Sequence, residues 1–271
     1  MKAVTGILLS TISILAVLAC TQTTDPNADL FTEAEVDTTL HINVLQDGDL
    51  TIFTIDKYET RVVKIPQISA YIYSERPTRS LEQIANDSGY SLVVNGSFFD
   101  ALYDDTVAHT GLHFRHAGYL RIGNTVYENV KEDKQLSRLF AYSFSKNMVA
   151  YFPVNELQNT DGYGLVVQIG PQIIWNNEVD TASINASLNG NRQARRTVFA
   201  SINGKEFYVI VATYVVTLAD LGTMLRSTGI FKKNLSVIDF DGGGSTRIYI
   251  KNHPELNYNA NAPWPLLICV K

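Results

Sequence analysis

The sequence predicts a single α+β domain over residues 36–271, in which a large, mostly antiparallel or mixed β-sheet system carries two main helices. Hydrophobic residues make up 45% of the 271 residues and charged residues only 18%, so the chain can bury a large core and is not a charge-rich disordered segment. Short alternating or β-branched runs recur along the chain, whereas only two segments combine helical periodicity with capping residues. No linker-like stretch interrupts the chain after residue 35.

The N-terminal segment has the pattern of an export sequence. Lys2 is followed by an apolar run from Ile7 to Ala19, which is shorter than the ~20 residues that span a bilayer and is typical of a secretory signal peptide. The residues Val17-Leu18-Ala19-Cys20 resemble a bacterial lipoprotein cleavage box. This resemblance implies removal of residues 1–19, lipid attachment to Cys20 and a location in the bacterial cell envelope, at the outer membrane and facing the periplasm or the surface. An ordinary signal peptide followed by a chance cysteine is the alternative.

Residues 20–35 are polar and turn-prone, which predicts a lipid-anchored tether between the membrane and the domain. The other cysteine, Cys269, lies in an apolar C-terminal run and is expected to be a buried thiol rather than a nucleophile. Two cysteines cannot build a disulfide framework or a zinc ribbon. The net charge of −5 leaves no basic excess for binding nucleic acid.

Strands are predicted wherever β-branched residues or period-two alternation dominate a short run. The dipeptide Asn203-Gly204 between two such runs predicts a type I′ hairpin, because both residues tolerate positive φ. Gly123-Asn124 predicts a second hairpin more weakly. The predicted strands cover 41–45, 50–55, 61–65, 70–73, 91–94, 119–122, 139–143, 148–152, 196–202, 206–213, 236–240, 246–250 and 266–270.

The two helices are expected at about 79–88 and 218–228. In the first, three apolar residues share a face and Gly89 stands where a C-cap glycine belongs. In the second, Thr217 is a suitable N-cap and Gly229 ends the helix. Gly170-Pro171 and the Asn-rich segment 176–191 are expected to be loops.

The first segment with more than an architectural meaning is a strand that runs into three glycines. Asp239 and Asp241 are two residues apart on the predicted strand, so both face the same side, and their repulsion would raise one pKa and create an acid. The consecutive N–H groups of Gly242, Gly243 and Gly244 could hold a phosphate in an anion nest. A glycine-rich turn with solvated aspartates is the alternative.

Two further segments bring polar side chains to strand ends. Asn95, in the run NGSFFD at 95–100, can both donate to and accept from a sugar hydroxyl or a phosphate oxygen, whereas each of its two phenylalanines is expected to fill the core. Arg196 precedes a strand and could clamp a phosphate bidentately, while Arg192 and Arg195 are expected to be solvated. The three histidines of AHTGLHFRHAG lack a compact zinc spacing, so we expect a single functional histidine, His113, and neither metal nor cofactor.

Taken in order, these motifs resemble the phosphodiester glycosidase family over about residues 70–270. The chain departs from the family pattern at Ser97, where a second glycine is usual, and at Asp239, where an asparagine is common. A glycine before the second helix and an arginine near the C-terminus also have no counterpart. The motifs that carry the resemblance are NGSFFD at 95–100, Gly111-Leu112-His113 with Gly118, Gly170-Pro171, Arg196-Thr197, the helix at 218–228 and DFDGGGST at 239–246.

The resemblance implies a hydrolase that cleaves the glycosidic C1–O bond of a sugar-1-phosphodiester in envelope, dietary or host glycans, through an oxocarbenium-like state. Asp241 would be the base or charge stabiliser, assisted by Asp239, and Asn95 would orient the sugar or phosphate. Arg196 and the glycine amides would hold the phosphate, and His113 would be an acid or phosphate contact. The remaining expected substrate-binding residues are Gly96, Ser97, Asp100 and Ser245, the last through a hydrogen bond within the turn.

Two other classes of function remain open at this point. A non-catalytic surface lipoprotein that binds glycans or sugar phosphates would retain affinity without turnover, and the departures at Ser97 and Asp239 favour it. A structural envelope protein would show neither binding nor turnover. The expected partners are therefore a carbohydrate or sugar-phosphate ligand and, through Cys20, a membrane.

Overall fold

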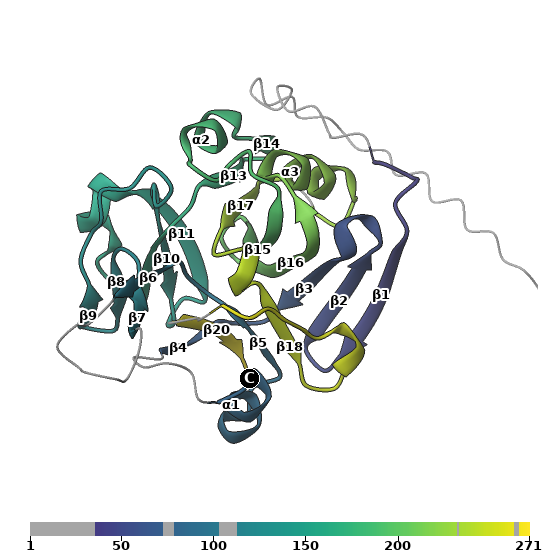
Figure 1. Ribbon diagram of the computed structural model, residues 1–271, viewed down its shortest axis with the longest axis horizontal. Helices are drawn as coiled ribbons and strands as arrows, with labels where there is room; N and C mark the ends of the chain where they lie inside the picture. Colours follow the sequence, from purple (N-terminus) through teal and green to yellow (C-terminus); the bar gives the residue numbers. More distant parts are fainter. Residues whose placement is uncertain (1–35, 73–78, 103–112, 232, 263–265) are drawn as a thin grey trace, which may run out of the picture. The chain divides into compact units, whose positions relative to one another are not determined.

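A computed structural model describes residues 36–72, 79–102, 113–231, 233–262 and 266–271 (Figure 1). The predicted signal peptide, the tether and Cys20 lie outside the described residues. Residues 34–271 group into one unit by their contacts. Strands contribute more residues to this unit than helices do. Every strand pair among the described residues is antiparallel, which agrees with the antiparallel form of the prediction rather than the mixed one.

An eight-stranded antiparallel sheet forms the centre of the unit, in the order β1-β2-β3-β16-β15-β17-β13-β14 (Figure 1). Its longest hairpin joins β15 and β16 through Asn203 and Gly204, whose φ angles of 52° and 65° confirm the predicted type I′ turn. The strands are β1 (Ile42–Asp47), β2 (Leu50–Ile55), β3 (Thr60–Ile65), β13 (Gln172–Trp175), β14 (Glu178–Val179), β15 (Ala194–Ile202), β16 (Glu206–Val216) and β17 (Leu235–Asp239).

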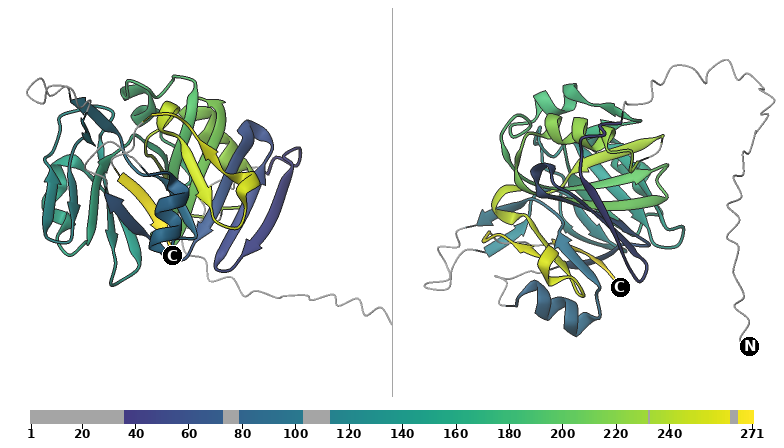
Figure 2. Two further views of the ribbon diagram at one scale, coloured as in Figure 1. Left: turned by 60° about the horizontal axis from the view of Figure 1, so that its bottom comes forward. Right: turned by 90° about the vertical axis from the view of Figure 1, so that its right-hand side faces the viewer.

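Two five-stranded sheets and one short hairpin complete the β structure (Figure 2). The first sheet has the order β11-β10-β12-β8-β9, with β8 (Leu120–Ile122), β9 (Thr125–Glu128), β10 (Arg138–Ser143), β11 (Met148–Pro153) and β12 (Leu165–Ile169). The second has the order β19-β18-β5-β20-β4, with β4 (Ser69–Ile72), β5 (Leu92–Asn95), β18 (Arg247–Ile250), β19 (Tyr258–Asn259) and β20 (Leu266–Val270). The hairpin pairs β6 (Phe99–Leu102) with β7 (His113–His116).

Both predicted helices are present, with the predicted caps at Gly89 and Thr217. Helix α1 (Leu81–Ser88) begins at a capping box of Ser80 and Gln83 and ends at Gly89, whose φ of 72° is left-handed. Helix α3 (Leu218–Ser227) begins at Thr217, whose hydroxyl accepts from the Asp220 N–H. The loop prediction for 176–191 is wrong in part, because this segment contains β14 and a third helix, α2 (Thr181–Ala186), capped by Asp180.

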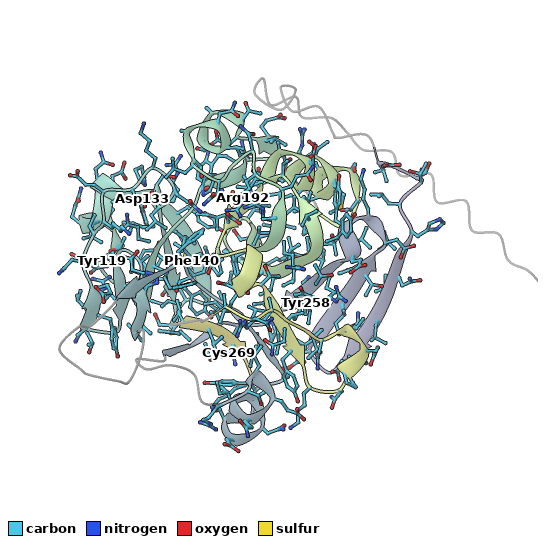
Figure 3. All side chains as sticks on the ribbon, in the orientation of Figure 1. Tyr119, Asp133, Phe140, Arg192, Tyr258 and Cys269 are labelled. Carbon is cyan, nitrogen blue, oxygen red and sulfur yellow. The ribbon has the colours of Figure 1, made fainter. Side chains whose placement is uncertain are left out.

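Hydrophobic residues bury both faces of the eight-stranded sheet. One face packs on the two five-stranded sheets around Phe140, Phe199 and Phe240, whose rings contact one another. The opposite face packs on α2 and α3, and α1 covers β5 and β20 of the second five-stranded sheet. Cys269 is fully buried in this last cluster, and burial raises the pKa of its thiol, as expected for a structural residue (Figure 3). The ends of strands from two different sheets meet at the edge of this hydrophobic core.

Candidate active site

The candidate site lies where the second five-stranded sheet meets the eight-stranded sheet. Asn95 is the last residue of β5, Asp239 is the last residue of β17, and Arg247 is the first residue of β18. Arg196 lies near the start of β15, whose Val198 pairs with Asp239. Segments about 145 residues apart in the sequence are thus brought together by sheet pairing, as the sequence predicted for one shared site.

Asn95 connects these strand ends through its side chain. Its Nδ2 donates to the main-chain carbonyl of Asp241 at 2.7 Å, and its Oδ1 accepts from Thr197 Oγ1 at 2.7 Å and from the Arg247 N–H at 3.0 Å. The side chain is fully buried. The structure therefore gives Asn95 the role of a positioning residue, and its predicted direct contact with a sugar or phosphate stays a prediction.

The glycine run forms a tight turn after β17. The N–H of Ser245 donates to the Gly242 carbonyl at 3.1 Å, which closes a 3-10 turn over Gly243–Ser245. A Cβ on Gly242 would collide with the carbonyl of Arg195, whereas Gly243 adopts a left-handed φ of 61° with open space around it. The Gly242 N–H donates to the Asp241 carboxylate, so this amide supports the acid rather than pointing outward as part of an anion nest.

Asp239 and Asp241 are both withdrawn from water, with exposed fractions of 1% and 8%. Burial raises the pKa of Asp239 to about 7, where Arg196 opposes the rise and Asp241 adds to it. Burial also raises the pKa of Asp241 to about 7, opposed by hydrogen bonds from Ser245 and Gly242 and by the charges of Arg247 and Arg196. The pair therefore changes its proton content near neutral pH. The sequence predicted one raised pKa caused by repulsion between the carboxylates, whereas both pKa values are raised and burial is the main cause.

Several oxygen atoms of the site have no hydrogen-bond partner among the described residues. They are Oδ1 and Oδ2 of Asp239, Oδ2 of Asp241, Oγ of Ser97 and Oγ1 of Thr246, and all are buried. Native proteins usually satisfy nearly all buried polar atoms. This concentration of unsatisfied acceptors and hydroxyls marks the place where a water or a ligand would complete the hydrogen bonding.

Two buried guanidinium groups flank the carboxylates. Arg196 Nη1 lies 3.6 Å from Asp239 Oδ2, while its Nε donates to Val216 O at 3.3 Å and its Nη2 donates to the carbonyls of Asn189 and Arg192. Because two of the three nitrogens are bound to main-chain carbonyls, Arg196 does not present the free bidentate edge that the sequence analysis predicted for a phosphate clamp. Nη1 faces the carboxylate instead.

Arg247 is the residue that sequence reasoning missed. Its Nε donates to Ser245 O at 3.1 Å, and its Nη2 donates to the carbonyls of Ala260 and Ala262. Burial lowers the pKa of Arg247 to about 10, and the charge of Asp241 opposes this shift. Its position directly after the glycine turn was the available indication, since a cation that follows an acidic, glycine-rich strand end can return to the same site.

The other predicted site residues lie around this centre with different surroundings. Gly96 packs against Ile268 of β20, and Asp100 forms an ion pair with Lys131 at 2.8 Å. His113 belongs to β7, but its side chain lies outside the described residues. The described neighbour His116 is buried, its Nε2 donates to Tyr119 O at 3.2 Å, and burial lowers its pKa to about 4.

Two expectations about surrounding side chains need correction. Phe98 and Phe99 are half-buried, so they are less enclosed than the core side chains that the sequence predicted. Arg195 is also not a solvated loop charge, since its guanidinium lies over the ring of Tyr258 at 5.6 Å. Arg192 is exposed as expected.

The described part of the chain holds no group of three or more His, Cys, Asp or Glu side chains that could bind a metal ion. None of its helices has the length and apolarity required to cross a membrane.

The site offers acid–base and charge-stabilising groups from the protein itself. These are two carboxyls, two guanidinium groups and the hydroxyls of Ser97, Ser245 and Thr246.

Comparisons with known proteins identify a family for the chain and similar folds among solved structures. The chain matches the family model of phosphodiester glycosidases over residues 88–270. It is similar in structure to the zebrafish N-acetylglucosamine-1-phosphodiester alpha-N-acetylglucosaminidase catalytic domain auto-inhibited by its pro-peptide, with a TM-score of 0.54 and 13% identity over 88% of this chain and 86% of that chain. It is also similar to a hypothetical protein from Synechocystis, with a TM-score of 0.51 and 11% identity over 86% of this chain and 62% of that chain. No curated protein matches the chain.

Proposed function

The chain belongs to the phosphodiester glycosidase family, and we propose that it hydrolyses the glycosidic C1–O bond of a sugar-1-phosphodiester. The family suggests glycosidase-type hydrolysis. The observation that carries the proposal for this chain is the buried pair Asp239–Asp241, whose pKa values lie near 7 between two guanidinium groups. Such a pair holds close to one proton at neutral pH, so an acid and a base are available together.

The chemistry requires little more than these groups. Cleavage of C1–O generates positive charge at C1 and releases a phosphate monoester, which is a good leaving group and needs less protonation than an ordinary alcohol. Asp241 is the more exposed of the two carboxyls, at 8% against 1%, and its Oδ2 has no hydrogen-bond partner among the described residues. It is therefore the group assigned to activate water or stabilise the positive charge. Asp239 tunes Asp241 through its charge and its proton.

The phosphate is assigned to the positive side of the site. Arg247 and Arg196 supply two fixed charges, and the turn at Gly243 and Gly244 supplies main-chain N–H groups on an accessible backbone. The buried hydroxyls of Ser97 and Thr246, which have no partner among the described residues, can donate to sugar or phosphate oxygens. This division places the negative diester beside cations and the developing positive charge beside carboxylates.

The proposed setting follows from the N-terminal segment. Removal of residues 1–19 and lipidation of Cys20 would hold the enzyme on a bacterial envelope membrane, within reach of envelope, dietary or host glycans. Labelling of the full chain with a radioactive fatty acid, and its loss in Cys20→Ser, tests this anchoring. Equal labelling of both proteins would contradict it.

Release of free sugar from synthetic sugar-1-phosphate methyl diesters, in both anomeric configurations, tests the activity. We expect turnover by the wild type, a loss of at least about 100-fold in Asp241→Asn, and wild-type rates in the exposed control Arg192→Ala. Equal rates in wild type and Asp241→Asn would show that the assignment is wrong.

A glycan-binding protein without catalysis is the second candidate. It is favoured by Ser97, which replaces a glycine of the family pattern with a buried hydroxyl. It predicts saturable binding of a sugar phosphate with no product over many hours. The Ser97→Gly variant of such a binding protein would gain no activity. If the protein is instead an enzyme whose rate is lowered by Ser97, the Ser97→Gly variant would have a higher turnover rate than wild type.

A further inference from the structure

A cavity of about 380 Å³ lies at the surface between β2, the start of β3 and the 3-10 turn Pro254–Leu256. Its volume falls within the ~300–1,000 Å³ of pockets that bind small molecules. None of the residues that line it belongs to the candidate active site. The lining residues used below are Thr54, Asp56, Glu59, Arg61 and Leu256. The cavity therefore has room for a small ligand and has no role in the proposed hydrolysis.

Strand pairing separates this cavity from the candidate active site. Arg61 pairs with Val211, and Val211 pairs with Thr197. The hydroxyl of Thr197 donates to Asn95 in the site. Neighbouring strands lie about 4.8 Å apart, so Arg61 is roughly 10 Å from Thr197. The cavity continues from Arg61 to Thr54 on β2, which is one strand further away, so its ligand and a substrate would occupy different places.

The guanidinium group of Arg61 has one edge without a partner. Its Nη1 donates to Glu59 O at 2.8 Å and to Thr213 Oγ1 at 2.9 Å. Its Nε is buried and has no hydrogen-bond partner among the described residues. Burial lowers the pKa of Arg61, and the charge of Glu59 opposes this shift. The edge formed by Nε and Nη2 can bind a carboxylate through two parallel hydrogen bonds.

The Thr54 hydroxyl adds a further donor beside this edge. Thr54 is the direct antiparallel partner of Arg61, so the two Cβ atoms lie about 4.5–5.5 Å apart on the same face of the sheet. This hydroxyl makes no hydrogen bond in the part of the chain that the structure describes. Leu256 contributes an apolar side chain that is partly buried against the core. The cavity thus offers donors for an anionic group next to an apolar contact.

Asp56 and Glu59 bring negative charge to the same cavity, and neither forms an ion pair within the described ranges. The Glu59 carboxylate is held in place, because its Oε2 accepts from Thr213 Oγ1 at 2.9 Å. Tyr58 and Glu59 have φ angles of 58° and 46°, and the left-handed conformation costs roughly 1–2 kcal/mol at a residue other than glycine. A strained turn therefore keeps the Glu59 charge at the cavity, where a cationic group can reach it.

The opposite charges are close enough for one small ligand to contact both. Arg61 Nη1 donates to Thr213 Oγ1, which in turn donates to Glu59 Oε2, so the two charged groups share one hydroxyl. A ligand with only negative charge would meet two carboxylates. A ligand with only positive charge would leave the buried Nε of Arg61 unpaired. An ammonium group next to a carboxylate satisfies both sides, and a free α-amino acid carries this pair of groups.

We propose that this cavity binds a free α-amino acid with an apolar side chain. The carboxylate of the amino acid binds the Nε–Nη2 edge of Arg61 and the Thr54 hydroxyl. The ammonium group lies at Glu59 and Asp56, and the side chain packs on Leu256. The site is independent of the proposed hydrolysis, since it shares no residue with the candidate active site.

Isothermal titration calorimetry of the full chain with L-leucine, N-acetyl-L-leucine and L-leucinamide tests the site. The acetyl derivative lacks the ammonium group, and the amide lacks the carboxylate. We expect the wild type to bind L-leucine and to bind each derivative at least about tenfold more weakly, because each derivative loses one charge-assisted contact. L-Leucine should also raise the Tm of the wild type.

Three variants locate the contacts. Glu59→Gln keeps an acceptor for Thr213 but loses the charge, so L-leucine should bind about tenfold more weakly while N-acetyl-L-leucine binds as in the wild type. Thr54→Val keeps the shape of the side chain and lies outside the strained turn, and it should weaken L-leucine about threefold to tenfold. Arg61→Gln should bind L-leucine and L-leucinamide equally. Lys57→Gln is the matched control, since this exposed cation lies in the same turn and does not line the cavity.

Three results would overturn the proposal. The first is a wild type that shows neither binding heat nor a higher Tm with about 10 mM L-leucine. The second is equal affinity of the wild type for all three compounds. The third is an affinity for L-leucine that is the same in the wild type, Thr54→Val and Glu59→Gln. Thermal unfolding without ligand verifies that each variant folds, and if Arg61→Gln does not fold, the other two variants decide.

Discussion

The side-chain amide of Asn95 donates a 2.7 Å hydrogen bond to the main-chain carbonyl of Asp241, and it thereby joins the ends of two strands from different sheets. The same side chain accepts from Thr197 and from the Arg247 N–H. One buried amide consequently sets the positions of a carboxylate and a guanidinium that are proposed to act on opposite charges of the substrate. The precision of the site depends on a residue that does not reach solvent.

Replacing Asn95 by alanine should therefore affect both stability and activity. The substitution leaves the Asp241 carbonyl, the Thr197 hydroxyl and the Arg247 N–H without a partner, and each costs about 1–3 kcal/mol when buried. We expect a loss of at least about 3 kcal/mol in the free energy of unfolding, measured with urea. Asn95→Asp keeps the acceptor but loses the donor, so its loss should be smaller. A fully stable Asn95→Ala would show that these hydrogen bonds are not important.

The raised pKa values of Asp239 and Asp241 predict the pH dependence of the proposed hydrolysis. With an ionised Asp241 as the base, kcat/KM should rise as the pH rises through about 7, rather than near the ordinary value for aspartate. Asp239→Asn removes a neighbouring carboxylate and leaves the charge of Arg196 to act on Asp241, so the inflection should move to lower pH. A profile that is flat from pH 5 to 8 in the wild type would contradict the assignment.

Arg247 should not be replaceable by lysine. Its guanidinium donates to three main-chain carbonyls in different directions, which a single ammonium group cannot reproduce. We expect Arg247→Lys to lower the free energy of unfolding by about 2–3 kcal/mol and to reduce kcat/KM by at least about tenfold. Arg192→Lys, on an exposed side chain, is the matched control and should change neither. If the two lysine variants had comparable unfolding free energies and kcat/KM values, Arg247 would not be part of the site.

The two glycines of the turn should respond differently to alanine. Gly242→Ala places a Cβ against the Arg195 carbonyl, and both are main-chain segments that cannot move independently. Gly243→Ala meets open space and suffers only the left-handed backbone, which costs about 1–2 kcal/mol. Thermal unfolding should thus show a small loss for Gly243→Ala and a much larger one for Gly242→Ala. The reverse order would contradict the described turn.

Much of the fold follows from local patterns, and two of the missed strands share a physical cause. The Gly89 cap of α1, the Thr217 cap of α3 and the Asn203-Gly204 turn depend on neighbouring residues, and all three were predicted. Strands β12 and β13 were not, because each contains a buried glutamine. Gln168 donates to the carbonyls of Lys131 and Leu136, and Gln172 donates to those of Ile174 and Val237. A polar side chain that hydrogen-bonds to distant main-chain groups interrupts the apolar pattern by which a buried strand is predicted.

In the site too, features that depend on neighbouring residues could be predicted from the sequence, whereas features that depend on tertiary contacts could not. Asp239 and Asp241 are neighbours in the sequence, so their electrostatic interaction could be predicted from it, although Asp241 lies beyond the end of β17. The orientation of Arg196 depends instead on carbonyls of Asn189 and Val216, which reach it only through the loop before β15 and the end of β16. The hydrogen bonds of Arg247 could not be predicted for the same reason. Its acceptor carbonyls lie in segments that only the folded hairpin brings together.

His116 provides a test of the buried polar surroundings of the NGSFFD hairpin. Its pKa is lowered by burial from 6.5 to about 4, so the native state binds fewer protons than the unfolded chain between these values. The stability that it contributes is present above pH 6.5 and is lost as the pH falls towards 4. The total change is on the order of 3 kcal/mol, from about 1.4 kcal/mol per pH unit.

Asp239 and Asp241 act with the opposite sign, because their raised pKa values favour the folded state at low pH and this contribution is lost as the pH rises through about 7. The His116 contribution must therefore be measured as a difference between wild type and His116→Gln, whose amide can still donate to Tyr119 O. The free energy of unfolding of His116→Gln minus that of wild type should increase by about 3 kcal/mol as the pH falls from 7 to 4, because only the wild type loses stability from this site. A difference that stays constant over this range would mean that the pKa of His116 is the same in the folded protein as in the unfolded chain.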